Sequence, residues 1–295
     1  MKLVINSLSK TYANGVHALK DVTLTLNNGM FGLLGPNGAG KSSLMRTIAT
    51  LQEADKGSIF LDDLDVLKNK TEVRQLLGYL PQEFGVYPKI SAERMLDHIA
   101  QLKGIGNKGE RNDLVASLLE NVNLSKDRKK HLGTFSGGMK QRFGIAQALI
   151  GDPKLIIVDE PTAGLDPAER NRFYNLLSQL GENTIVILST HIVEDVSTLC
   201  SNFAIICQGE VLYAGDPETA VTEMEGKIYS KAISKTEIGF YKDDYQVIST
   251  QLKSGRLHIR VIAEAAPGNG FISAMPNLED VYFCNIATRV DVNTI

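Results

Sequence analysis

Residues 35–42 read Gly35-Pro36-Asn37-Gly38-Ala39-Gly40-Lys41-Ser42, between an apolar run and a helical pattern. The glycines allow successive backbone N–H groups to converge on phosphate oxygens, and a helix that begins here adds about half a positive charge. Lys41 would supply a cation to the β- and γ-phosphates of a nucleotide, and Ser42 would ligate Mg²⁺, with Ser43 as a further contact. A glycine-rich turn beside a surface lysine is the alternative, which the complete spacing disfavours.

The residues on either side of this loop predict a strand, a loop and a helix in succession. The apolar run at 30–34 and the alternating apolar positions at 22–26 indicate two strands. After the loop, Leu44, Ile48 and Leu51 recur at helical spacing and should share one buried face. A further strand is expected near residues 57–61.

A second motif ends in two carboxylates and reads Leu155-Ile156-Ile157-Val158-Asp159-Glu160. Four apolar residues in a row are typical of a parallel strand that is buried on both faces. Ligands bind at the carboxyl ends of such strands, so Asp159 is expected to hold Mg²⁺, directly or through water. Glu160 would polarise the attacking water. A strand that ends in solvated acids is the alternative, and the phosphate loop elsewhere in the chain argues against it.

The middle of the chain predicts helices, and the part after it returns to alternating strands and helices. Apolar residues recur at helical spacing within 91–150 in two groups: Met95, Ile99 and Leu102, and then Leu114, Leu118 and Leu119. From residue 154 the pattern indicates strands at 155–158 and 184–188, helices at 167–180 and 192–199, and a hairpin across Gln208 and Gly209.

The fold class that these patterns predict is α/β, with a P-loop NTPase core in residues 1–216 and a helical insertion at about 88–150. Past Asp216-Pro217 the pattern changes to short strands at 227–234 and 256–263 and a final helix from Asn277. We therefore expect residues 217–295 to form a small α+β accessory domain. This part has no glycine loop followed by a lysine and a helix, so it should take no part in the chemistry.

Composition excludes several classes of function. The 295 residues carry a net charge of −3, and the basic residues are scattered, so nucleic acid is not expected as a partner. The three cysteines lack metal-ligand spacing and their odd number argues against a disulfide-stapled secreted domain. The N-terminal segment lacks the pattern of an export signal, and no apolar run reaches the roughly 20 residues of a spanning helix. These features predict a cytoplasmic chain.

The segment Phe135-Ser136-Gly137-Gly138-Met139 narrows the class of nucleotide-binding protein. It resembles the signature of ATP-binding cassette (ABC) ATPases, usually L-S-G-G-Q, which stands shortly before the strand motif. Phe135 and Met139 depart from that pattern, whereas Ser136-Gly137-Gly138 is intact. Ser136 followed by two glycines should also begin a helix that runs to about residue 150 and offers a second anion site. An ordinary serine N-cap is the alternative.

Four further residues match functional positions of this family in the expected order: Tyr12, Gln82, Asp166 and His191. The resemblance implies that Tyr12 stacks on adenine, that Gln82 reaches Mg²⁺ and the water, and that His191 contacts the γ-phosphate. Asp166 joins the nucleotide-binding set. The structural alternatives are packing for Tyr12, an exposed loop amide for Gln82, a helix N-cap for Asp166 and a plain helix-start histidine at position 191.

The resemblance covers residues 1 to about 220 and implies an ABC ATPase fold with an antiparallel β subdomain. It implies that the cofactors are ATP and Mg²⁺ and that the signature faces the γ-phosphate of ATP bound to a second copy of the chain. Two copies would enclose two ATP molecules and hydrolyse them to power a membrane transporter. The partners would be this second copy and integral membrane permease subunits, which would hold the chain at the inner face of the cell membrane.

Two segments bear on the kind of transporter. Pro276-Asn277-Leu278-Glu279-Asp280-Val281-Tyr282-Phe283 looks like the ending of cassettes from bacterial multidrug, antibiotic-resistance and lipid or polysaccharide exporters, although an amphipathic helix explains it equally well. Residues 83–90 would form part of a groove for a permease helix, with Phe84, Val86 and Tyr87 as apolar contacts. A soluble ABC ATPase without a transport role remains the alternative. The transported substrate is not encoded in these motifs.

Overall fold

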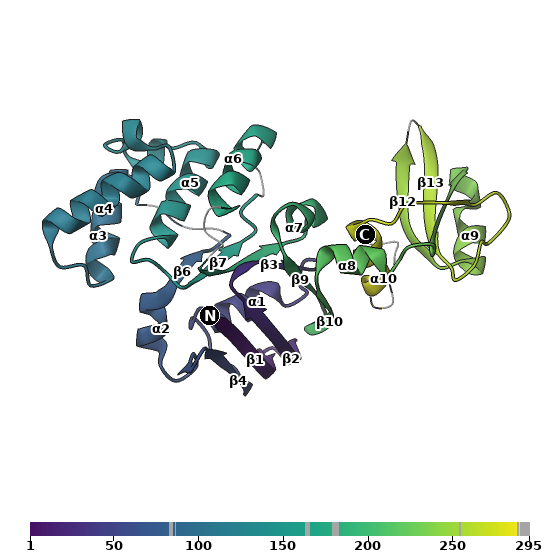
Figure 1. Cartoon of the computed structure of the whole chain (residues 1–295), viewed down its shortest axis with the longest axis horizontal. Coiled ribbons are helices and arrows are strands. Elements are labelled where there is room, and N and C mark those ends of the chain that lie inside the picture. Colours follow the sequence, from purple (N-terminus) through teal and green to yellow (C-terminus); the bar gives the residue numbers. More distant parts are fainter. Residues whose placement is uncertain are drawn as a thin grey trace.

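The computed structural model describes residues 1–82, 85, 87–162, 166–178, 183–253, 255–287 and 289. Its centre is a six-stranded sheet in the order β10-β9-β3-β8-β7-β6, in which every neighbouring pair is parallel except β9 and β10 (Figure 1). The strands of this sheet are β3 (Gly29–Leu34), β6 (Leu77–Leu80), β7 (Leu155–Asp159), β8 (Ile185–Thr190), β9 (Asn202–Cys207) and β10 (Glu210–Gly215).

An antiparallel sheet covers one face of the central sheet through helix α1 (Lys41–Ile48). Its order is β2-β1-β4-β5, which confirms the expected antiparallel subdomain. Leu44 and Ile48 of α1 are buried together with Leu33 of β3 and Ile5 of β1. The strands are β1 (Lys2–Thr11), β2 (His17–Asn27), β4 (Lys56–Leu61) and β5 (Leu64–Asp65), and α2 (Lys70–Leu76) follows them.

Helices cover the other face of the central sheet. Successive strand residues point to opposite faces, so Ile156 and Val158 of β7 pack on these helices, whereas Leu155 and Ile157 face α1. The covering elements are α3 (Ala92–Leu102), α4 (Lys108–Asn121), η1 (Ser125–Asp127), η2 (Leu132–Thr134), α5 (Gly137–Ala148), α6 (Pro167–Ser178) and α7 (Val193–Leu199). This arrangement confirms the α/β fold class and the helical character of the middle segment.

The C-terminal part adds a third, antiparallel sheet in the order β12-β13-β11-β14, which Figure 1 shows projecting away from the cassette with α9. One face of this sheet packs on α9 around Tyr241. The other side contacts α10, which also packs on α7, β9 and β10. The elements are α8 (Pro217–Thr222), β11 (Ile228–Ile233), η3 (Lys235–Glu237), α9 (Ile238–Asp244), β12 (Val247–Lys253), β13 (Arg256–Ile262), β14 (Ile272–Ser273) and α10 (Leu278–Ile286).

The main apolar core crosses residue 216, the expected end of the nucleotide-binding domain. Val281 and Ile286 of α10 belong to the same buried cluster as Phe203 and Ile205 of β9. The division at 216 stays a proposal, because an accessory unit that shares this core cannot be removed without exposing the apolar face of β9. Among the described residues, no helix combines the length and the apolar character needed to cross a membrane.

One residue that was expected on a buried helix face is exposed, and a second helix buries other residues than its large apolar ones. Helix α1 ends at Ile48 because Thr50 adopts a left-handed backbone conformation (φ 60°), which leaves the Leu51 side chain 59% exposed. In α3 the fully buried stripe is Ala92, Leu96 and Ala100, and Leu102 is 74% exposed. The small alanines let neighbouring helices approach closely, a possibility that the spacing of large apolar residues alone did not reveal.

Candidate active site

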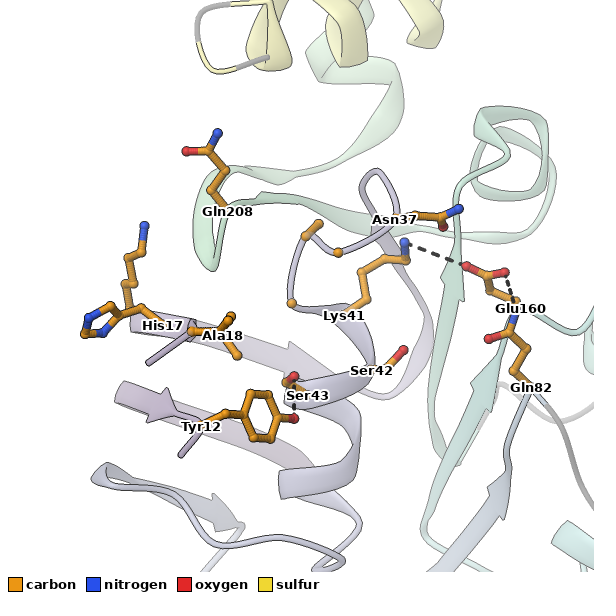
Figure 2. Close-up of a pocket in the computed structure, with 15 residues that line it drawn as sticks. Tyr12, His17, Ala18, Asn37, Lys41, Ser42, Ser43, Gln82, Glu160 and Gln208 are labelled. Atoms are coloured by element: carbon orange, nitrogen blue, oxygen red, sulfur yellow. Dashed lines mark hydrogen bonds and ion pairs between the residues drawn. The ribbon is translucent and has the colours of Figure 1, made fainter. Parts of the chain in front are cut away.

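Four loops at one edge of the central sheet bring together part of the predicted site. Because β3, β8, β7 and β6 are parallel neighbours, their carboxyl ends meet at one edge. The residues that follow these strands are the phosphate loop with Lys41, then His191, Glu160 and Gln82. Figure 2 shows Lys41 and Gln82 pointing toward Glu160 from opposite sides.

The phosphate loop holds its lysine in a defined position. Lys41 is 5% exposed, and its Nζ donates hydrogen bonds to the carbonyl oxygens of Gly35 (2.6 Å) and Pro36 (3.1 Å). Gly40, at the N-cap of α1, has φ 110°, and a Cβ atom there would lie 2.5 Å from the Ala18 carbonyl oxygen. A glycine is therefore required, and no side chain caps the first N–H groups of α1. These groups are available to an anion.

Glu160 is the point at which the loops make contact. Its Oε2 accepts a hydrogen bond from Gln82 Nε2 (2.9 Å), and its Oε1 lies 3.4 Å from His191 Nδ1 and 3.8 Å from Lys41 Nζ. The Glu160 backbone has φ 46°, an unfavourable conformation for a non-glycine residue, and its N–H donates to the Ser189 carbonyl oxygen (3.0 Å). The strained turn aims the carboxylate at the cavity.

Lys41 and Asp159 are buried charged groups whose charges are not fully balanced by neighbouring groups of the chain. Burial lowers the pKa of Lys41, and the carboxylates of Glu160 and Asp159 act in the opposite direction. Burial also raises the pKa of Asp159, and the nearby Glu160 carboxylate adds to that increase. A ligand that carries both negative charge and a cation would compensate each group.

Asp159 fits the expected role of a magnesium ligand. It is 5% exposed, and its Oδ1 has no hydrogen-bond partner among the described residues. A buried carboxylate oxygen without a donor is costly unless a cation satisfies it. In the described part of the chain no three His, Cys, Asp or Glu side chains cluster to hold a metal.

A cavity of about 860 Å³ opens from the phosphate loop toward Tyr12. Its size is within the range of small-molecule sites. The Tyr12 hydroxyl lies 2.9 Å from Ser43 Oγ and donates to Gln52 Oε1 (3.0 Å), and Figure 2 shows the ring on the opposite side of the pocket from Glu160. The lining comprises Tyr12, Val16, His17, Ala18, Lys20, Asn37, Gly38, Ala39, Gly40, Lys41, Ser42, Ser43, Gln82, Glu160 and Gln208.

The signature residues do not line this cavity. The Ser136 hydroxyl caps α5 by accepting from the Met139 N–H (3.2 Å), as its sequence predicts. A Cβ atom at Gly138 would lie 2.8 Å from the Glu169 carboxylate, the end of a flexible side chain that would have to shift. Asp166 Oδ1 accepts from the Glu169 N–H (2.8 Å) and thereby caps α6. Ser136, Gly137, Gly138 and Asp166 are absent from the residues that line the cavity.

Sequence reasoning missed two groups of residues near the site. His17, Lys20 and Gln208 line the cavity beside Tyr12, but nothing in their local pattern distinguishes them from ordinary strand and hairpin residues. Asp195 is buried beneath the loops that carry Glu160 and His191. An acidic residue in the first turn of a helix is explained by its favourable interaction with the helix dipole, so its sequence position gave no sign of a buried role. Of the expected permease groove, Phe84 and Val86 lie outside the described residues, and Tyr87 is exposed.

Comparison with known proteins gives one consistent result. A sequence profile described as ABC transporter matches residues 19–163. The chain is 39% identical over 207 residues to the ABC transporter ATP-binding protein NatA of Bacillus subtilis (strain 168), which covers 69% of this chain and 84% of that protein. It is 36% identical over 226 residues to the linearmycin resistance ATP-binding protein LnrL of the same organism, with 76% and 72% covered.

Solved structures agree with these sequence relatives. A dimeric ATP-binding cassette in a post-hydrolysis state, bound to ADP and Pi, superposes with a TM-score of 0.67 at 25% identity. The match covers 72% of this chain and 98% of that one. Together with a cavity that the phosphate loop and Glu160 line, these relatives establish that the chain belongs to the ABC transporter family, as an ATP-binding subunit that hydrolyses ATP.

Proposed function

We propose that two copies of this chain close on two Mg·ATP and that the closure powers a membrane exporter. The observation that carries this proposal is the incomplete site. The phosphate loop, Glu160 and Gln82 line one cavity, whereas Ser136 and Gly138 do not. The cavity therefore lacks the second anion site that the sequence carries, and a second copy is the simplest source of it.

Within each cavity the residues have separate tasks. Lys41 and the N-terminus of α1 bind the β- and γ-phosphates. Tyr12 stacks on adenine. Ser42, Asp159 and Gln82 would hold Mg²⁺, which neutralises phosphate charge when bound. Glu160 orients and polarises the attacking water, and His191 contacts the γ-phosphate from the other side of Glu160. Asp166, with Ser136, Gly137 and Gly138, completes the site of the partner copy.

Complementation between two inactive variants tests the composite site. Lys41→Ala removes the phosphate-binding cation, and Ser136→Arg places bulk and charge on the signature without touching the chain's own phosphate loop. Each variant alone should be inactive, and a mixture should regain ATPase activity, because a mixed dimer has one intact site. The matched control is Ser125→Arg, a serine in η1 away from the cavity lining, which should stay active alone. No recovery at any ratio, although both variants bind their partner, would contradict independent composite sites.

The membrane partners are proposed from the relatives. NatA is described as an ABC transporter ATP-binding protein and LnrL as a linearmycin resistance ATP-binding protein, and removal of an antibiotic is an export task. Integral membrane permease subunits would then recruit the chain to the inner face of the membrane. Co-purification of a multi-span membrane protein with the tagged chain from detergent extracts tests this step. Recovery of the chain only from the soluble fraction, with no membrane partner, would favour a soluble ABC ATPase instead.

Residues 217–295 are proposed to form an accessory unit that adjusts docking or dimerisation. Gln208, which lines the cavity, donates through Nε2 to the Arg289 carbonyl oxygen (2.9 Å). Glu210 pairs with Arg289 (3.0 Å) and with Lys20 (3.5 Å), and Lys20 also lines the cavity. These contacts connect the end of the described chain to the nucleotide pocket without placing a group of the C-terminal unit on the reacting atoms.

A further inference from the structure

The most completely buried carboxylate beside the site belongs to Asp195, in the first turn of α7. Its side chain is 0% exposed and accepts hydrogen bonds from three hydroxyl groups. Thr162 Oγ1 donates to Oδ2 at 2.7 Å, Thr190 Oγ1 donates to Oδ2 at 2.8 Å, and the Tyr174 hydroxyl donates to Oδ1. The three donors come from three different segments of the chain.

Burying the Asp195 carboxylate in this way lowers the free energy of unfolding, so stability alone does not explain the arrangement. Moving a carboxylate out of water costs several kcal/mol even after relaxation, and none of the three hydrogen-bond partners brings a positive charge. Arg170 of α6 pairs with Glu194, the residue before Asp195 (3.7 Å). Apolar side chains of similar volume would fill the space between α6 and α7 at lower cost. The cost therefore indicates that these hydrogen bonds serve a purpose other than stability, such as fixing the positions of the segments that they join.

Two of the three partners of Asp195 lie close in sequence to the residues proposed to act on ATP. Thr190 precedes His191, and its Oγ1 also accepts a hydrogen bond from the Ile192 N–H (2.9 Å), so both neighbours of His191 are held. Thr162 follows Glu160 by two residues, and the Glu160 N–H is bonded to the Ser189 carbonyl oxygen. One carboxylate thus ties the loop after β7 to the loop after β8.

We propose that Asp195 is a positioning residue for ATP hydrolysis, because it holds His191 and Glu160 in register through Thr190 and Thr162. The inference rests on the proposed roles of Glu160 and His191. The 3.4 Å separation between His191 Nδ1 and Glu160 Oε1 then depends on a side chain that touches neither ATP nor water. Tyr174 attaches the same carboxylate to α6, which makes the pair of loops part of the packed helical layer.

The chemistry of the three donors explains why a carboxylate is required. An ionised carboxylate only accepts hydrogen bonds, so it can accept one from each of the three hydroxyl groups. An asparagine of the same shape presents an NH₂ group to at least one of these hydroxyls, which must then rotate or lose its partner. Asp195→Asn should therefore preserve packing and disturb the loops.

Steady-state ATPase kinetics of the full-length protein give the first test. Asp195→Asn should lower kcat by about 10²-fold, because displacement of catalytic groups by about 1 Å has effects of this size. The KM for ATP should change little, since Lys41 and its loop belong to β3 and α1. The matched control is Asp280→Asn, another buried carboxylate that is hydrogen-bonded by Arg260 far from the site, and it should leave kcat unchanged. Wild-type kcat in folded Asp195→Asn would overturn the inference.

A spectroscopic test separates positioning from a loss of stability. The ¹³Cε1 signals of the five histidines can be followed by NMR, with that of His191 assigned from His191→Ala. In Asp195→Asn the His191 signal should move or broaden while the other four stay in place. An unchanged His191 signal would overturn the inference even if kcat fell. If Asp195→Asn does not fold, Thr190→Val tests the same connection with the carboxylate intact, and should lower kcat and move the same signal.

The two levels of the argument fail differently. A His191→Ala protein that keeps wild-type kcat would contradict the proposed role of His191 itself. An inactive His191→Ala protein beside a fully active Asp195→Asn protein would leave that role standing and remove only the positioning role of Asp195.

Discussion

The chain contains two buried charge clusters that are built in opposite ways. In the C-terminal unit, Arg260 and Asp280 form a bidentate pair at 2.6 Å on both sides, and the Met275 carbonyl oxygen and the Asn277 N–H complete it. At the nucleotide site, the nearest approach of Lys41 to Glu160 is 3.8 Å. The oxygen Asp159 Oδ1 meets no donor among the described residues.

The difference shows which of the two clusters is a ligand-binding site. Asp280, 1% exposed, has its charge fully matched within the chain, so nothing further can bind there. Lys41 and Asp159 are also buried, at 5% exposed each, but they are incompletely paired within the chain, so a ligand that carries both negative charge and a cation would stabilise them. A structural ion pair and a ligand site therefore differ in how completely their charged groups are paired within the chain, and not in how deeply they are buried.

The largest expected effect comes from Lys41→Ala. Loss of the phosphate-binding cation should reduce kcat/KM on the order of 10⁴-fold, about 5.4 kcal/mol, and weaken ATP binding. Thermal stability should change little, because the cost of burying the Lys41 charge offsets the hydrogen bonds that its Nζ donates to the carbonyl oxygens of Gly35 and Pro36. Lys103→Ala is the matched control: this lysine caps the end of α2 through the carbonyl oxygens of Arg74 and Leu77, away from the site. ATP titration and phosphate release measure both variants, and undiminished hydrolysis by Lys41→Ala would refute the assignment.

Glu160→Gln should be next in size. The amide keeps the shape of the side chain but cannot take part in proton transfer, so kcat should fall about 10³-fold, or about 4 kcal/mol, while ATP still binds. ATP should then trap a dimer, which gel filtration with light scattering detects. Glu237→Gln, in the capping box before α9, serves as the control. A variant that remains monomeric at saturating ATP argues against closure of two chains without the permease.

The closed cluster should respond in stability rather than in activity. Arg260→Met leaves Asp280 buried without its cation, which should lower the free energy of unfolding by about 3 kcal/mol. The kcat per folded molecule should be retained. Urea unfolding and ATPase assays at low temperature test both statements. Loss of kcat in protein that is still folded would show that the C-terminal unit takes part in the chemistry.

Alkaline pH gives the smallest effect and tests the contact between α10 and the cassette. Burial raises the pKa of Tyr282 from its ordinary value of 10.0 to about 12. The protonated form is therefore favoured in the folded chain, and stability is lost as pH rises from 10 through 12. By pH 11 the wild type should lose about 1 kcal/mol relative to Tyr282→Phe. Unfolding curves of both proteins between pH 8 and pH 11 check this, and parallel pH profiles would mean that α10 separates from β9 before the chain unfolds.

Much of the fold could be predicted from local patterns. Apolar runs located β3 and β7, and capping residues located the starts of α5 and α6. The misses have physical causes. Leu51 was expected on the buried face of α1, but the left-handed backbone at Thr50 follows the end of the helix at Ile48 and leaves Leu51 exposed. The short elements α2 and β6 lack a long enough repeat to stand out.

The sequence by itself determined the chemistry of the nucleotide site, because the phosphate loop and the Asp159-Glu160 pair are each contained in one short segment. It also carried the family resemblance through Ser136-Gly137-Gly138. Only the tertiary structure decided which groups meet: the strand order β3-β8-β7-β6 brings His191 and Gln82 to Glu160. It alone places Asp195 beneath them, since hydrogen bonds from Thr162, Tyr174 and Thr190 join segments that no local pattern connects.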